Sequence, residues 1–335
     1  MRFRRTAKAA GHDEQYIVAC LEYANRLYFR SLPIIFDQTH FSYLAGYSLN
    51  YILGATNAKF HFYRQFDIRK RSGGVRTISE PLPSLKEIQR WILENILEKI
   101  EVHPAAKGFV RNKSIRDNAR FHRNQPKLLS MDIEDFFGSI NKSMINAIFN
   151  KIGYSAAVSK LLTELCSLYD SLPQGAPTSP ALSNIVCRSL DKRFLGFALK
   201  NGFRYTRYAD DISFSGDLPV GSLIQFVRKV LNEHGFQVND AKTRLMHKGR
   251  QQKVTGIIVN EKLQAPRLIR RKLRQEVFFI KKFGLDTHLR NRQISKGNHI
   301  KFLIGRANYI VNVNPNDKEA REYLGFLREL DSSSE

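Results

Sequence analysis

The stretch Phe203-Arg-Tyr-Thr-Arg-Tyr-Ala-Asp-Asp-Ile-Ser-Phe-Ser215 places two adjacent acids between two strand-forming segments. Before the acids, aromatic and β-branched residues predict a strand. After them, Ile212 and Phe214 alternate with serines, which predicts a second strand with one buried face. Asp210 and Asp211 therefore fall in a tight turn. An isolated Asp-Asp pair is good turn chemistry, and that interpretation outweighs a functional one by roughly ten to one.

A third acid lies at the end of another predicted strand, in Leu128-Leu-Ser-Met-Asp-Ile-Glu-Asp-Phe-Phe137. Leu129, Met131 and Ile133 alternate along it, so Asp132 points away from the buried face. Three carboxylates brought together repel one another at neutral pH unless a cation neutralises them. Ligands that are all oxygen favour a hard ion such as Mg²⁺, and two such ions about 4 Å apart suit nucleotide addition.

The charge balance favours a polyanionic partner. Lys and Arg number 54 against 31 Asp and Glu, so the 335-residue chain carries a net charge of +23. This excess favours nucleic acid over a merely basic surface. No run of about 18 apolar residues predicts a membrane span. The 3 cysteines are far apart and the 9 histidines form no HExxH or similar pair, so we expect a reducing cytosol and no zinc chemistry.

A basic β-hairpin is predicted over residues 66–79, with Gly73-Gly74 as a two-residue turn. That turn would place Arg71 opposite Arg76, with Arg69 on the same face. Three guanidinium groups on one face repel unless an anion lies over them. A solvated basic hairpin is the alternative.

Two further regions predict helices. Residues 84–100 carry an apolar stripe at helical spacing, and Ser84 and Glu87 predict a capping box at its start. The C-terminal quarter has the same spacing. Its basic residues suit a nucleic-acid backbone and a solvated face equally well, and they include Arg270, Arg271 and Arg274.

In this order, the segments resemble the motifs of reverse transcriptases. Tyr208-Ala-Asp-Asp211 resembles the active-site motif, and Leu129-Ser-Met-Asp132 followed by Phe136-Phe137 resembles the first catalytic motif. Between them, Leu172-Pro-Gln-Gly-Ala-Pro-Thr-Ser-Pro-Ala-Leu-Ser-Asn184 resembles the loop and helix that support the templating base and the incoming nucleotide. Each motif alone is moderately specific, whereas the three in this order are strongly specific.

More narrowly, the chain resembles bacterial retron reverse transcriptases. Their NAxxH element is matched by Asn118-Ala-Arg-Phe-His122, and their VTG triplet by Val254-Thr-Gly256. The resemblance implies an α+β right-hand polymerase. A helical region over 1–60 would precede interleaved fingers and palm over 61–255, with an antiparallel palm sheet backed by helices. A helical thumb would follow over 256–335.

The resemblance also implies roles for the matched residues. Asp132, Asp210 and Asp211 would be the catalytic carboxylates and would bind two Mg²⁺ ions, with the backbone carbonyl of Ile133 completing one shell. The dNTP-binding residues would be Arg69, Arg76, Phe137, Gln174, Gly175 and Lys242. The RNA-binding residues would be Asn118, His122, Val254, Thr255, Gly256, Arg270, Arg271 and Arg274.

Within these sets, some roles are more specific. The two fingers arginines would grip the triphosphate, and Phe137 would be the steric gate against a ribose 2′-hydroxyl, whereas Phe136 would pack in the core. Lys242 would lie near the leaving pyrophosphate. His122 would contact RNA or serve as a structural hydrogen bonder rather than act in catalysis.

The implied function is RNA-directed DNA synthesis from dNTPs on a cognate structured noncoding RNA of the msr-msd type. Priming from an RNA 2′-hydroxyl would give branched, RNA-linked msDNA that serves in anti-phage defence. The implied partners are this RNA, its DNA product, a separate effector protein and a host ribonuclease H, in the cytoplasm and without a membrane. The alternatives are a non-retron bacterial reverse transcriptase, of abortive-infection or group II-like type, and a catalytically idle RNA-binding scaffold.

Overall fold

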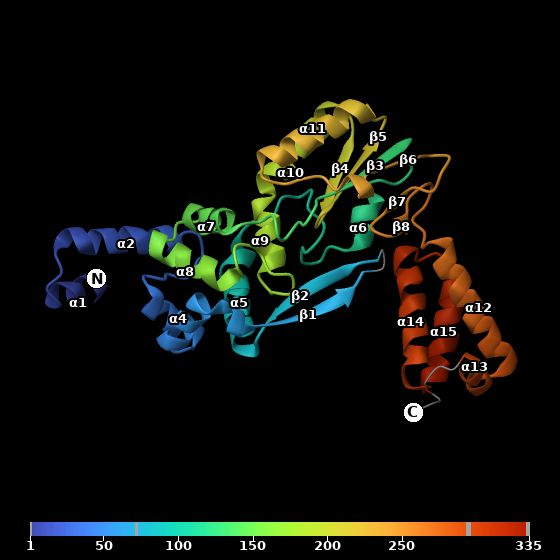
Figure 1. Ribbon diagram of the computed structural model, residues 1–335, viewed down its shortest axis with the longest axis horizontal. Coiled ribbons are helices and arrows are strands. Elements are labelled where there is room, and N and C mark those ends of the chain that lie inside the picture. Colours follow the sequence, from blue (N-terminus) through green and yellow to red (C-terminus); the bar gives the residue numbers. More distant parts are fainter. Residues whose placement is uncertain (1, 71–72, 293–295, 333–335) are drawn as a thin grey trace. The chain divides into compact units, whose positions relative to one another are not determined.

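The structure is a computed structural model that describes residues 2–70, 73–292 and 296–332 (Figure 1). Contacts divide the chain into two compact units that interleave along the sequence. Unit 1 comprises Met1–Val110, Ile133–Arg193 and Lys229–Gln237. Unit 2 comprises Arg111–Asp132, Phe194–Arg228 and Val238–Glu335. The predicted boundary between palm and thumb, at residue 255, falls inside unit 2.

Unit 2 contains an antiparallel sheet with the strand order β4-β5-β3-β6. The strands are β3 (Lys127–Asp132), β4 (Arg204–Tyr208), β5 (Asp211–Gly216) and β6 (Arg244–His247). Tyr208 pairs with Asp211, so Ala209 and Asp210 form a two-residue turn between β4 and β5. The α+β fold, the antiparallel sheet and the acidic turn are therefore confirmed.

One face of this sheet is aromatic. Tyr205 and Phe214 are cross-strand partners, and the ring centroid of Phe194 lies 5.4 and 5.8 Å from theirs. Phe194 also contacts Phe226, with 6.0 Å between ring centroids. Phe194 and Phe226 belong to two helices that Figure 1 shows beside the sheet, α10 (Arg188–Lys200) and α11 (Val220–Glu233). Such aromatic packing contributes strongly to core stability because each ring buries a large apolar area.

The opposite face of the sheet is also buried, although its residues are largely polar. Leu128 on this face is 0% exposed, and so is Ser215, its partner on β5. The polar residues hydrogen-bond to helix α6 (Ile115–Arg120) and the residues that follow it. The sequence predicts only one buried face because buried serines and threonines look like exposed ones until their partners are known.

A short hairpin links the sheet to the C-terminal helices of unit 2. Strands β7 (Lys253–Val254) and β8 (Ile257–Ile258) enclose Thr255 and Gly256, whose φ angles are +43° and +88°. Two successive positive φ angles are typical of a type I′ turn, which matches the twist of a two-stranded ribbon. The 3-10 turn η3 (Asp240–Lys242) lies earlier in this unit.

The C-terminal part of unit 2 is a helical bundle, as predicted. Its helices are α12 (Arg267–Phe283), α13 (Leu285–Arg292), α14 (Lys296–Val313) and α15 (Lys318–Ser332). Leu273 and Val277 of α12 pack with Leu303 of α14 and Leu327 of α15 in one buried cluster. The bundle therefore has an apolar core of its own.

Unit 1 combines helices with a two-stranded ribbon. Its helices are α1 (Arg2–Ala9), α2 (Glu14–Tyr28), α3 (Gln38–Ala45), α4 (Leu49–Asn57), α5 (Pro83–Asn95), α7 (Lys142–Lys151), α8 (Ala156–Cys166) and α9 (Ser179–Val186), with 3-10 turns η1 (Lys59–Phe62) and η2 (Leu97–Lys99). The predicted capping box in α5 is wrong. Pro83 occupies the first turn instead, which suits proline because its missing N–H needs no partner there, and Glu87 accepts a hydrogen bond from Tyr47.

The ribbon of unit 1 has a different register from the predicted one. Strands β1 (Tyr63–Arg69) and β2 (Val75–Pro81) pair Arg69 with Val75 and Ile68 with Arg76. The connection is closed by hydrogen bonds between Lys70 and Gly74, and from Gly73 to Lys70. Arg69 and Arg76 therefore point to opposite faces of the ladder, not to the same face. Arg71, which was predicted to face Arg76, lies outside the described residues.

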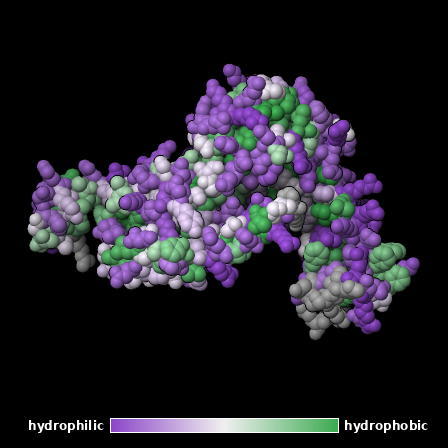
Figure 2. Space-filling model, in the orientation of Figure 1, coloured by the Kyte–Doolittle hydropathy of each residue, from purple (hydrophilic) through white to green (hydrophobic). Residues whose placement is uncertain are grey.

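The surface agrees with the charge balance. Hydrophilic residues dominate the face shown in Figure 2, with smaller hydrophobic patches between them. Within the described ranges, every helix is too short or too polar to cross a lipid bilayer.

Candidate active site

The three predicted carboxylates lie together at one end of the unit 2 sheet. Asp132 and Asp211 are Cα partners in the last rung of the β3–β5 ladder, and Asp210 directly precedes Asp211 in the turn. Side chains on directly opposed positions have Cβ atoms about 4.5–5.5 Å apart. Asp132 is only 5% exposed. The fold thus holds like charges close together in a partly dehydrated place.

A buried arginine stabilises the turn that carries Asp210. Ala209 has a φ of +57°, a conformation that costs energy for any residue other than glycine. Nη1 of Arg207 donates a hydrogen bond of 3.0 Å to the carbonyl of Ala209. Arg207 is 0% exposed, and it is not among the residues predicted from the sequence. It lies two residues after Tyr205 in the same strand, so the alternation of the strand places it on the apolar face and could have predicted its burial.

Lys242 supplies positive charge to this cluster. Its Nζ atom donates to both carboxylate oxygens of Asp132, at 2.9 Å each, and this contact raises the pKa of Lys242. The backbone N–H of Asn239 donates to the carbonyl of Asp132 at 2.8 Å, which holds η3 against the end of β3. The amine therefore belongs to the carboxylate cluster, as its predicted place in the active site requires.

One of the three acids is perturbed by the other two. Burial, which is the largest cause, and the charges of Asp210 and Asp132 together raise the pKa of Asp211 to about 6, whereas Lys242 acts in the opposite direction. Burial and the neighbouring carboxylates both penalise the charged form of Asp211, so a bound cation would stabilise the ionised cluster.

Divalent cations fit this donor set. Carboxylate oxygens are the ligands that Mg²⁺ prefers, and a bound cation would offset the burial and the like charges that raise the pKa of Asp211. Ions held here would be suited to activate an attacking hydroxyl and to stabilise a leaving pyrophosphate in nucleotide addition. The carbonyl of Ile133 directly follows Asp132 in the chain, and its part in a coordination shell remains a prediction.

A buried polar network fills the same face of the sheet. Nε2 and Nδ1 of His122 lie 2.7 Å from the hydroxyl oxygens of Thr206 and Ser215, respectively. The hydroxyl of Thr206 donates to Oδ1 of Asn118 at 2.6 Å, so it must accept from Nε2–H of His122. Nδ1 is then the acceptor for Ser215, which fixes a neutral imidazole. Burial, together with the nearby Arg204, lowers the pKa of His122 to about 3.

The network continues into the β7–β8 turn. Nδ2 of Asn118 lies 3.5 Å from the hydroxyl of Thr255, which in turn donates to the carbonyl of Ile115 at 3.4 Å. The hydroxyl of Tyr309 in α14 donates to the carbonyl of Gly256 at 3.3 Å. The two short motifs, residues 118–122 and 254–256, are therefore parts of one structural network.

This arrangement revises three of the predicted RNA contacts. Asn118, His122 and Val254 are 1%, 0% and 2% exposed, so the structure does not present their side chains to an RNA. The structural role that the sequence left open for His122 is the one that its two hydrogen bonds support. Thr255 and Gly256 are half-buried, and their contact with RNA remains a prediction.

The predicted nucleotide-binding residues other than Lys242 belong to unit 1. Ser79 N–H donates to the carbonyl of Gln174 at 2.8 Å, which attaches the predicted nucleotide-supporting loop to strand β2. Gly175 has a φ of +127°, and an added Cβ would lie 2.9 Å from the carbonyl oxygen of Ser79. The close approach that requires this glycine is therefore to the protein's own strand.

Two adjacent aromatic residues of unit 1 differ in exposure, as expected. Phe136 is 5% exposed and lies 6.1 Å from Phe236 between ring centroids, so it belongs to the core. Phe137 is half-buried, with its centroid 6.1 Å from that of Phe109. A half-buried ring is compatible with a gate, and that role remains a prediction.

The predicted thumb arginines have intramolecular partners. Arg274 makes a bidentate contact with Glu319, at 2.5 and 2.7 Å, and Arg270 pairs with Asp317 at 3.1 Å. Both contacts join α12 to the start of α15 and its preceding loop. Arg271 lines a groove of about 730 Å³ that also holds Arg267, Arg270, Arg274, Phe278 and Phe279. The basic and aromatic lining is typical of surfaces that bind nucleic acid.

Comparison with known proteins agrees with these motifs. Residues 68–326 match the family model described as "Reverse transcriptase (RNA-dependent DNA polymerase)". The chain is 34% identical to the retron Mx162 reverse transcriptase of Myxococcus xanthus over 320 residues, which cover 82% of this chain and 64% of that protein. It is 36% identical to the retron Ec86 reverse transcriptase of Escherichia coli over 203 residues, 59% of this chain and 63% of that protein.

Another relative is covered more fully. The chain is 32% identical to the retron Ec83 reverse transcriptase of Escherichia coli over 270 residues, which cover 76% of this chain and 83% of that protein. By contrast, the matches with the Mx162 and Ec86 proteins span a little under two thirds of those proteins' lengths.

The network predicts a large effect from one hydroxyl group. We expect Thr206→Val to reduce the free energy of unfolding by at least about 1–3 kcal/mol, because it leaves His122 and Asn118 with unsatisfied buried groups. Thr206→Ser, which keeps the hydroxyl, should cost roughly 1 kcal/mol or less. Urea denaturation at neutral pH measures both. Equal losses in the two variants would contradict the network.

The raised pKa of Asp211 predicts a pH-dependent effect on the metal-free protein. Because the folded state holds this proton more tightly, protonation stabilises the fold fully below pH 3.8, and the stabilisation is lost as the pH rises through about 6. In EDTA at pH 7.5, Asp211→Asn should therefore be more stable than the parent by about 1–3 kcal/mol.

The difference between these two proteins should shrink as the pH falls from 7.5 towards 4, and thermal melts across this range measure it. Titrating groups that lie away from the cluster, such as His122, are common to both proteins and cancel. Asp217→Asn is the control, since Lys127 lowers the pKa of Asp217 and its loss should not stabilise the protein. A gain for Asp211→Asn that is constant with pH would contradict the assignment.

Proposed function

Because this chain belongs to the reverse transcriptase family and, within it, to the retron reverse transcriptases, we propose that it is an RNA-directed DNA polymerase. It copies part of a cognate structured noncoding RNA of the msr-msd type into DNA, using dNTPs. The observation that carries this proposal is the pairing of Asp132 with Asp211 in the ladder, next to Asp210. Three carboxylates that are held together and partly buried are costly unless cations neutralise them.

We assign the catalytic chemistry to the carboxylate cluster. Asp132, Asp210 and Asp211 hold two Mg²⁺ ions, and Ile133 contributes its carbonyl. Lys242 lies on the cluster and is cationic, so it is suited to donate a proton or a hydrogen bond to the leaving pyrophosphate. Its contact with Asp132 supports a position at the reacting end of the substrate.

We assign substrate binding to the residues that match the family motifs. Arg69 and Arg76 contact the triphosphate, and Gln174, Gly175 and Phe137 form the surroundings of the incoming nucleotide. The groove beside α12, which includes Arg271, binds the RNA or its hybrid with DNA. These roles rest on the family motifs and on the chemistry of the side chains.

At the level of the retron, the proposed product is branched msDNA, primed from a 2′-hydroxyl of the RNA itself. Its role is anti-phage defence with a separate effector protein, and a host ribonuclease H trims the template. Since the RNA is transcribed in the same cell, the expected place of action is the cytoplasm. These retron-specific assignments are supported by the sequence identity of 32–36% between this chain and retron reverse transcriptases.

Polymerase activity should depend on the carboxylate pair. We expect Asp210→Asn together with Asp211→Asn to lower DNA synthesis on an RNA template by at least about 10³-fold, because bound metal ions stabilise the transition state by several kcal/mol. Primer extension with labelled dNTPs measures this. Asp217→Asn, directly after β5 and outside the cluster, is the control. Parent-like synthesis by the double variant would favour the idle RNA-binding scaffold.

The gate assignment predicts a change in sugar selectivity. Phe137→Ala should improve incorporation of rNTPs relative to dNTPs by roughly 10- to 100-fold, because it opens space for a 2′-hydroxyl. Phe136→Leu is the control, since that ring is buried with Phe236 and should influence stability rather than selectivity. Steady-state kcat/KM ratios for the two sugars provide the measurement. An unchanged ratio would remove Phe137 from the site.

The nature of the product separates the retron from its alternatives. Nucleic acid that co-purifies with the protein should contain DNA of fixed length joined to RNA by a 2′–5′ bond. Sequencing combined with debranching-enzyme treatment detects this bond. Random-sequence DNA attached to protein would indicate an abortive-infection polymerase, and unbranched copies of an intron RNA would indicate a group II-like enzyme.

A further inference from the structure

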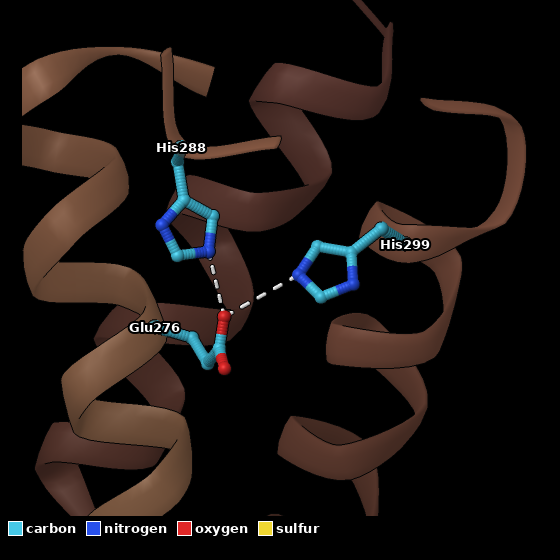
Figure 3. A group of neighbouring side chains, drawn as sticks. All are labelled: Glu276, His288 and His299. Carbon is cyan, nitrogen blue, oxygen red and sulfur yellow. Dashed lines mark hydrogen bonds and ion pairs between the residues drawn. The ribbon is translucent and has the colours of Figure 1, made fainter. Parts of the chain in front are cut away.

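Three metal-ligating side chains converge in the C-terminal bundle, far along the chain from the carboxylate cluster. Glu276 of α12, His288 of α13 and His299 of α14 point toward one another in Figure 3. Nε2 of His288 lies 2.7 Å from Oε2 of Glu276, and Nε2 of His299 lies 3.4 Å from the same oxygen. The ligand atoms of all three residues lie within 4.8 Å of one another.

The two imidazoles do not share this oxygen equally. His288 makes a hydrogen bond to it, whereas Nε2 of His299 is buried and has no hydrogen-bond partner among the residues that the structure describes. The side chain of His299 is 8% exposed, so water does not readily serve this nitrogen. A buried polar atom that is aimed at a carboxylate without bonding to it requires an explanation, and a cation between the groups provides one.

The surroundings orient the three ligands. Nη2 of Arg292 lies 3.4 Å from Oε1 of Glu276, which leaves Oε2 for the two histidines. The ring of Phe279 lies against His288, with centroids 6.3 Å apart, and that of Phe302 lies 6.3 Å from His299. Packing of this kind limits ring rotation, and an outer contact that fixes a ligand is typical of metal sites in proteins.

We propose that Glu276, His288 and His299 bind a divalent transition-metal ion of the Zn²⁺ class, in the helical bundle and apart from the polymerase metal site. Two imidazoles and a carboxylate are an established ligand set for zinc, with a fourth, non-protein ligand completing the tetrahedron. Metal–ligand bonds of about 2.0–2.1 Å place neighbouring ligands about 3.3 Å apart. The separation of His299 from Glu276 already has this value, and that of His288 needs to widen by about half an ångström.

Such an ion would connect three helices of the bundle. Its ligands come from α12, α13 and α14, so binding would stabilise the packing of α13 between its neighbours. Imidazole nitrogens select zinc-like ions over Mg²⁺, whereas the oxygen-only cluster at Asp132 prefers Mg²⁺. The two sites therefore differ in metal preference, and this proposal does not depend on the proposed polymerase function.

A zinc-class ion at this cluster would go against the expectation that zinc chemistry is absent. That expectation rested on the lack of a short ligand motif. Here the ligands are 12 and 11 residues apart along the chain, on three different helices. Only the folding of the bundle brings them together.

The test is titration of the full-length, EDTA-treated protein with Co²⁺, whose visible absorption reports tetrahedral nitrogen and oxygen ligation. The chain carries Asp132→Asn, Asp210→Asn and Asp211→Asn, so that the polymerase site does not compete. We expect one Co²⁺ per chain, displaced by Zn²⁺ but not by a large excess of Mg²⁺. The parent chain, titrated in parallel, shows whether the three Asn substitutions disturb the bundle.

Substitution of the proposed metal ligands tests whether these side chains bind the ion. His288→Gln and His299→Gln should each weaken Co²⁺ binding by at least about 10-fold and abolish the Zn²⁺-dependent rise in melting temperature. Glu276→Gln serves if either variant fails to fold. His61→Gln, an exposed histidine of unit 1, should bind as the parent does.

Two outcomes would overturn the proposal. If the chain shows no visible Co²⁺ absorption, or if the two histidine variants bind as His61→Gln does, the cluster is a proton-linked ion pair only. Neither result bears on DNA synthesis, because no nucleic acid or nucleotide is present in the titration.

Discussion

The antiparallel pairing of β3 with β5 is the constraint on which the site depends. Its last rung sets Asp132 opposite Asp211, and a one-residue shift in register would turn one of them to the other face. Like charges at opposed positions destabilise a sheet, so the ladder persists because its other rungs and both of its faces stabilise it. Lys242 offsets part of the repulsion, whereas burial and the charges of Asp210 and Asp132 still raise the pKa of Asp211.

The two faces of the sheet stabilise that rung in different ways. On one face, the rings of Phe194, Tyr205 and Phe214 bury apolar area without any demand for hydrogen bonds. On the other, His122 and Asn118 satisfy hydroxyl groups that burial would otherwise penalise. The second arrangement is directional, so it fixes the position of the strands as well as their burial. A site of charged groups requires both, because it adds no stability of its own.

The sequence predicts the strands and the acidic turn well, because alternation and turn composition are local signals. It does not predict the ribbon register, since Gly73 and Gly74 allow more than one connection and a shift of an odd number of residues reverses the face of Arg76. It also misses Arg207, whose burial depends on partners distant in the chain. Likewise, the place of His122 follows from Thr206 and Ser215, which lie more than 80 residues away.

The buried network gives a physical reason why two short motifs occur in one chain. The side chain of Asn118 contacts the hydroxyl of Thr255. Thr255 occupies a turn position with a positive φ, a conformation that a β-branched residue rarely adopts. The strain at Thr255 is tolerated because its hydroxyl is held by Asn118 and Ile115, and the next residue is held by Tyr309 of α14. The motifs thereby connect the sheet that carries the acids to the helical bundle. Their first role is therefore structural, because they fix the bundle to the part of the polypeptide that carries the acidic sheet.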